Sequence, residues 1–115
     1  MKKQVISLMM AVCLLFSLSL TANAAVKDGI EYYANGYNSS TGRVGGAMYS
    51  EEDVDFKIVF KYYDIHHDYI DSETFIKPNT TEIEAYDTPP RNADHVIIKF
   101  YYNNKKLDQV LIPTT

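Results

Sequence analysis

The sequence predicts an all-β protein: a single small antiparallel β-sandwich, immunoglobulin-like or similar, of about seven strands after a cleaved signal peptide. Three observations lead to this prediction. The first 24 residues resemble a secretory leader, apolar and polar residues alternate with period two in several later segments, and all ten tyrosines follow the leader. Tyrosine and β-branched residues favour strands over helices.

The N-terminal segment has the pattern of a signal peptide. Lys2 and Lys3 precede an apolar run over residues 5–20, and small residues follow at Ala22 and Ala24. We predict cleavage after Ala24, so that residues 1–24 are the signal peptide and residues 25–115 form one domain. The alternative is a membrane anchor, but the run of 16 residues is shorter than the roughly 20 that span a bilayer. The protein is therefore expected to be secreted, to the medium or the cell envelope, with no membrane span after cleavage; the leader is typical of bacteria.

Composition excludes several classes of partner. The chain has one cysteine, Cys13, which lies in the predicted leader and is poorly placed for a lipoprotein signal. The domain can therefore form no disulfide, with itself or with a partner. Without Lys2 and Lys3, nine lysines and arginines remain against 15 acids. An acidic domain argues against binding to nucleic acid or to anionic lipid.

The first predicted strands form a hairpin. Residues 30–37 make one strand, which ends at the turn-forming stretch NSSTG, and residues 43–49 make its partner. The pair Gly45-Gly46 weakens the second strand and is expected to mark a β-bulge.

The segment Val54–Tyr63 has the clearest alternation. Phe56, Ile58, Phe60 and Tyr62 fall on one face, and Asp55, Lys57 and Lys61 fall on the other. Helical spacing is a second interpretation, because a stretch resembling a capping box precedes the segment. We favour the strand, because β-branched and aromatic residues dominate the segment.

The remaining strands follow at short intervals. Residues 69–77 and 81–86 form two strands that stop before prolines, and residues 94–103 repeat the alternation. A turn at Asn103-Asn104 then leads to a partner strand over residues 107–112. The predicted core consists of the apolar positions of the two best strands, which are Phe56, Ile58, Phe60, Val96, Ile98 and Phe100.

The segment Asp64–Asp68, DIHHD, is the candidate for metal chemistry. If it were extended, Asp64, His66 and Asp68 would share one face, which makes them weak candidates for metal ligands. A structural zinc site needs four ligands, and only His95 could add a second imidazole. We therefore interpret the segment as a solvated turn and predict no cofactor and no metal.

Catalytic motifs are missing from the sequence. No serine lies in a G-x-S-x-G elbow, and no H-E-x-x-H or phosphate-binding loop occurs. We expect an exported, non-enzymatic binding domain that acts on an extracellular protein or an envelope polymer. The alternative is a small metal-dependent protein or hydrolase that uses His66, His67 and Asp68.

Tyrosine doublets indicate where a partner would bind. Neighbouring residues of a strand face opposite ways, so each doublet places one ring outward. The inward parity of Phe60 and Phe100 predicts that Tyr63 and Tyr101 face outward, and Tyr33 is assigned outward with less support. Lysines share the outward parity. The predicted binding residues are Tyr33, Tyr63, Tyr101, Lys61 and Lys99, on a locally basic face that suits an acidic partner.

Overall fold

The computed structural model describes residues 22–114, with side chains from residue 25 onward. These residues form one antiparallel sheet of six strands. The strands are β1 (Ala22–Lys27), β2 (Ile30–Asn38), β3 (Arg43–Tyr63), β4 (Tyr69–Asp87), β5 (His95–Tyr102) and β6 (Lys105–Pro113). Most of the predicted signal peptide, residues 1–21, lies outside the described residues. Within residues 22–114, no helix is long and apolar enough to cross a membrane.

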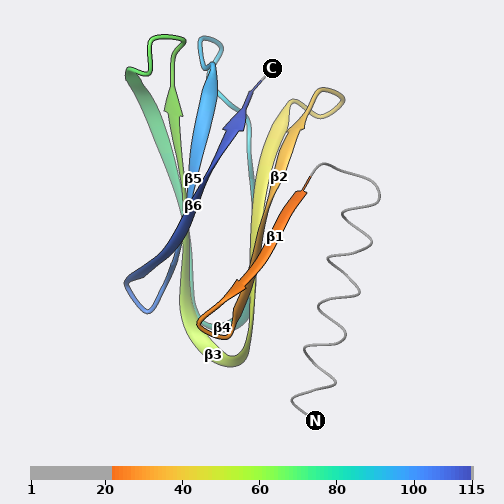
Figure 1. Cartoon of the computed structure of the whole chain (residues 1–115), viewed down its shortest axis with the longest axis vertical. Coiled ribbons are helices and arrows are strands. Elements are labelled where there is room, and N and C mark those ends of the chain that lie inside the picture. The colour runs from red at the N-terminus through yellow and green to blue at the C-terminus, as the bar shows by residue number, and fades with distance from the viewer. Residues whose placement is uncertain (1–21, 115) are drawn as a thin grey trace.

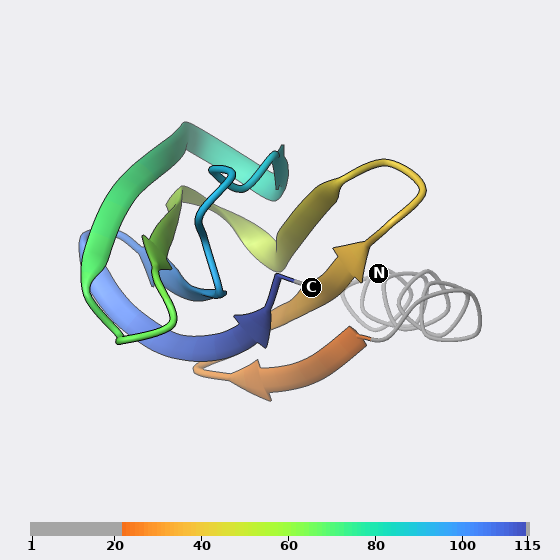
Figure 2. The ribbon, with the colours of Figure 1, turned by 90° about the horizontal axis from the view of Figure 1, so that it is seen from above.

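A bend in the long strands β3 and β4 shapes the sheet into a half-barrel (Figures 1 and 2). The first part of β3 pairs with β2 and the second part pairs with β5, while β4 follows β3 along its other edge. At the bend, residues 50–53 of β3 stand opposite Thr81 alone. Extra residues on one strand bend it and increase its twist. The sheet thus has an N-terminal half, β1-β2-β3-β4, and a C-terminal half, β4-β3-β5-β6.

Two features of the sequence-based fold are corrected. The described residues contain six strands rather than seven, because residues 43–49 and 54–63 join into β3, residues 69–77 and 81–86 join into β4, and β1 is additional. They also form one continuous sheet, whereas an immunoglobulin-like sandwich has two. The predicted strands were separated at residues 50–53, which resemble a capping box, and at Pro78. In the structure they lie at the bend, where the ladder is irregular but not interrupted.

The predicted core is confirmed. Phe56, Ile58, Phe60, Val96, Ile98 and Phe100 are all 0% exposed. They pack against inward residues of the N-terminal half, and the ring centroids of Tyr32 and Phe100 lie 5.2 Å apart. Full burial of each large apolar side chain contributes about 1.5–3 kcal/mol. The core therefore joins the two halves of the sheet.

Gly45 and Gly46 do not mark a bulge. Both pair regularly with β2 and β4, and the register shift between β2 and β3 lies farther on, between Asn35 and Asn38. A Cβ at Gly46 would lie 3.2 Å from Cε1 of Phe100, and a Cβ at Gly45 would lie 2.7 Å from the ring of Tyr86. The two glycines therefore make room for an aromatic ring on each face of the sheet.

The predicted C-terminal hairpin is confirmed. Asn103 and Asn104 have φ of 48° and 64° and connect Tyr102 directly to Lys105. Two residues with positive φ form the hairpin turn that matches the twist of the strands. The turn fixes the register of Lys105 and Lys106 against β5, and a register shift between Phe100 and Tyr101 then sets the pairing of the rest of β6.

Candidate functional site

The outer surface of the C-terminal half carries a grid of side chains, which we call the outer face. Register shifts interrupt the grid beside Tyr63 and beside Tyr101. The ladder places these residues in four rows across β4, β3, β5 and β6. The rows are Tyr69-Tyr63-His95-Pro113, Ser72-Lys61-Ile97-Leu111, Thr74-Val59-Lys99-Gln109 and Ile76-Lys57-Tyr101-Lys106. None of these sixteen residues is acidic, although the chain has more acids than bases.

The four lysines of the outer face lie among aromatic rings and near one another. The Nζ atom of Lys57 lies 4.3 Å from the ring centroid of Tyr101, and that of Lys61 lies 5.8 Å from the centroid of Tyr69. Desolvation lowers the pKa of Lys99, and the charges of Lys61 and Lys106 lower it further. The outer face is therefore a local concentration of positive charge.

Apolar side chains separate the lysines. Ile76 is 67% exposed and Leu111 is 56% exposed. Val59 and Ile97 are partly exposed between them. Positive charge, aromatic rings and exposed aliphatic groups on one side of a sheet are features of recognition surfaces.

Four of the five predicted binding residues lie on the outer face. Tyr63, Tyr101, Lys61 and Lys99 have the predicted outward parity, and each is partly exposed. The prediction that Tyr33 is exposed is wrong. Tyr33 lies on β2, in the other half of the sheet, and is 1% exposed. It has outward parity, but its ring stacks on that of Tyr49 at a centroid distance of 6.3 Å. The side of the sheet on which a residue lies is therefore not enough to predict its exposed fraction.

The segment DIHHD is a tight turn between β3 and β4. The Oδ1 atom of Asp64 accepts hydrogen bonds from the backbone N–H groups of His66 (2.9 Å) and Asp68 (3.0 Å). The Asp68 bond is the main reason why the pKa of Asp64 is lowered. Asp64 therefore closes the turn, and His66, Asp64 and Asp68 do not form an extended ligand face.

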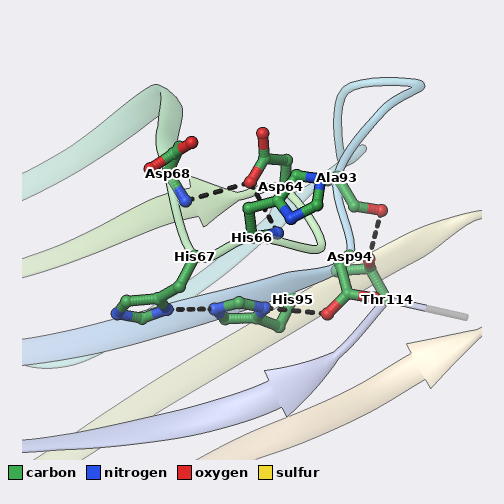
Figure 3. A network of polar contacts seen from close by, with 8 residues as sticks. All are labelled: Asp64, His66, His67, Asp68, Ala93, Asp94, His95 and Thr114. Atoms are coloured by element: carbon green, nitrogen blue, oxygen red, sulfur yellow. Dashed lines mark hydrogen bonds and ion pairs between the residues drawn. The ribbon is translucent and has the colours of Figure 1, made fainter.

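His67, rather than His66, has a long-range partner (Figure 3). Its Nδ1 atom lies 2.7 Å from Nε2 of His95, and Nδ1 of His95 lies 2.9 Å from Oδ2 of Asp94. The ring of Tyr63 stacks on both imidazoles, at centroid distances of 4.6 Å and 5.4 Å. This contact ties the turn to β5 at one end of the outer face.

Asp94 determines which ring nitrogen of His95 and of His67 carries the proton. Its backbone is held by hydrogen bonds to Tyr63 (2.8 Å) and from Thr114 (3.0 Å). Because a carboxylate only accepts hydrogen bonds, His95 carries its proton on Nδ1. In the neutral pair, Nε2 of His95 then accepts from Nδ1–H of His67. This leaves the Nε2 lone pair of His67 directed away from His95.

Within residues 22–114, no group of three or more His, Cys, Asp or Glu side chains is arranged to hold a metal ion. His67 also has φ of 63°, an unusual conformation outside glycine, although histidine is enriched there. Stacking on Tyr63 and the bond to His95 compensate for that strain. We therefore assign the cluster of His67, His95 and Tyr63 a structural role, which is to hold the turn against β5.

Sequence reasoning missed the partners of His67 and two residues of the outer face. Tyr69 and Lys106 join the face only through the register of β4 and β6, and His95 meets His67 only because β5 lies beside β3. The alternation of each strand gives the parity of its residues, but no pattern in the sequence gives the order β3-β5-β6.

A pocket of about 450 Å³ lies at the opposite end of the molecule, where the β1–β2 turn meets the bend. It is lined by acidic and aromatic residues, among them Asp28, Glu51 and Tyr102. The hydroxyl of Tyr102 donates to Oδ2 of Asp28 at 2.9 Å. The charge of this pocket is thus opposite to that of the outer face.

No protein-family model matches the sequence, and the chain matches neither a curated protein nor a solved structure.

Proposed function

We propose that the chain is an exported, non-enzymatic binding domain whose outer face recognises an anionic partner outside the cytoplasm. On this proposal, residues 1–24 direct export and are removed. The partner is an acidic surface, on an extracellular protein or an envelope polymer.

One observation carries the proposal: the outer face holds four lysines and no acid, in a chain with 15 acids and 11 basic residues. A face of one sign attracts partners of the other and raises the rate at which they associate. Tyr101 and Tyr69 add rigid aromatic area to the same face.

The test is capture of partners by the exported protein from its native medium and envelope fraction, before and after charge reversal. The variant is Lys61→Glu with Lys99→Glu, at two partly exposed positions of the outer face. The matched control is Lys77→Glu, at an exposed lysine of β4 that points to the other side of the sheet opposite Phe56. We expect the double variant to lose the captured partner and the control to retain it. Equal capture by all three proteins would contradict the proposal.

The alternative, a metal-dependent protein built on the DIHHD turn, is tested on the same preparation. Stoichiometric zinc in the purified protein, lost on His66→Ala, would favour the alternative over the binding domain.

A further inference from the structure

Three of the four lysines of the outer face lie on one diagonal of the ladder. Lys61 is in the second row on β3, Lys99 is in the third row on β5, and Lys106 is in the fourth row on β6. Each step crosses one strand and advances one row. Neighbouring strands are about 4.8 Å apart and rows are about 6.8 Å apart, so successive lysines are separated by about 8 Å and the diagonal spans about 17 Å.

The electrostatics of Lys99 agree with this arrangement. Lys99 occupies the middle of the diagonal, and the two charges that lower its pKa are those of Lys61 and Lys106. The fourth lysine, Lys57, lies off the line with its Nζ atom over the ring of Tyr101.

Uncharged residues border the diagonal on both sides. One neighbouring diagonal of the grid is Tyr63-Ile97-Gln109, and the other is Ser72-Val59-Tyr101. At the end of the lysine diagonal, the next position on β4 is Tyr69, whose ring lies 5.8 Å from Nζ of Lys61. The face therefore presents a line of three lysines between partly aromatic margins, and the ammonium group of the fourth lysine, Lys57, lies over the Tyr101 ring of one margin.

We infer that the anionic partner is a linear polyanion that lies along the Lys61–Lys99–Lys106 diagonal, with its backbone against the neutral margins. This inference rests on the proposed function and narrows it. A line of charges complements a chain of negative groups that repeats along its length. A compact acidic site on a protein would be better matched by lysines clustered around one point.

Binding of phosphate chains of different length tests the inference. The probes are pyrophosphate, which is too short to span the diagonal of about 17 Å, and long-chain inorganic polyphosphate, which can span all three lysines. We expect the exported protein to bind the long chain on the order of a hundredfold more tightly, because attachment to one lysine raises the effective concentration of phosphate at the next. If the two probes bind with equal affinity, after correction for the number of binding positions along the long chain, the inference is overturned.

Single substitutions test the line itself. Lys61→Gln, Lys99→Gln and Lys106→Gln should each weaken binding of long-chain polyphosphate by about two- to fivefold. Each should also lower the slope of log affinity against log salt by about 0.7, the value for one contact with a single-stranded polyanion. The matched control is Lys57→Gln, which removes the same charge from the same face. It should change the affinity and the salt slope less than the other three substitutions do. If Lys57→Gln weakens binding as much as the others, the total charge matters and the line does not.

The two levels of the proposal fail differently. If the native partner is lost on charge reversal of Lys61 and Lys99 but long polyphosphate binds no better than pyrophosphate, the outer face binds a compact acidic partner, and only the linear polyanion is overturned. If charge reversal leaves capture of the native partner unchanged, the proposed function itself fails.

Discussion

Phe100 and Gly46 provide the strictest test of how the two halves of the sheet pack. Phe100, on β5, is 0% exposed, and its Cε1 atom would lie 3.2 Å from a Cβ placed on Gly46 of β3. Phe100→Ala should lower the free energy of unfolding by about 3–5 kcal/mol. A domain of this size has about 5–14 kcal/mol in total, so the variant should fold but unfold at much lower denaturant.

Gly46→Ala should have opposite effects in the two backgrounds. In the wild-type protein the new methyl group overpacks the core at a cost of about 1–3 kcal/mol, less about 0.4–1 kcal/mol gained from a stiffer unfolded chain. In Phe100→Ala the methyl group enters the vacated space, so the substitution should be neutral or stabilising. The resulting coupling energy is about 1–3 kcal/mol.

Urea-induced unfolding of the four proteins, followed by circular dichroism, measures this coupling. The matched control is Gly45→Ala, whose Cβ meets the ring of Tyr86 on the opposite face. Tyr86 is 40% exposed, so its ring has room to rotate. The effect of Gly45→Ala on the free energy of unfolding should therefore add to that of Phe100→Ala. Additive effects of Gly46→Ala and Phe100→Ala, within about 0.5 kcal/mol, would refute the packing of β5 against the first part of β3.

Three further predictions concern hydrogen bonds. Burial and the bond to Asp108 raise the pKa of Tyr32 to about 12. Because this pKa exceeds the unfolded value of 10, the contribution of Tyr32 to the free energy of unfolding should be full below about pH 10 and fall between about pH 10 and 12. If the tyrosinate absorbance of the folded protein were complete by about pH 11, this prediction would be wrong. Tyr62→Phe removes the donor to Asp87, at 2.5 Å, and should lower the free energy of unfolding by about 0.5–1.5 kcal/mol, whereas an unchanged urea midpoint would show that the bond contributes nothing. His67→Asn keeps a residue that tolerates positive φ but removes the contact with His95; amide exchange should accelerate in residues 64–68 and stay unchanged at Ile58, and His66→Asn should leave both unaffected.

The local pattern of the sequence predicted the parts of the structure that depend on local chemistry. All six residues that alternation predicted for the core are buried, because a pleated strand sends alternate side chains to opposite faces. Asn103-Asn104 identified the hairpin, because asparagine tolerates positive φ. The outward parity of Tyr63 and Tyr101 followed from the same alternation.

Features that depend on distant pairing could not be predicted. The prediction divided β3 in two at residues 50–53, because the continued pairing with β4 across the bend is visible only in the structure. Tyr33 shows the limit for exposure, since parity does not reveal that Tyr49 packs on it. The contact of His67 with His95 and the lysine diagonal both require the order β3-β5-β6, which a single sequence does not encode in any local pattern.

The most direct test of the central claim is a map of the bound surface in solution. Backbone ¹H–¹⁵N spectra of the protein are recorded during titration with long-chain polyphosphate. We predict that the largest shifts follow the diagonal across β3, β5 and β6, at Lys61, Lys99 and Lys106 and their neighbours, while residues of the acidic pocket at the bend stay unchanged. Shifts centred on that pocket or on the β1–β2 hairpin, with the outer face unchanged, would contradict the account.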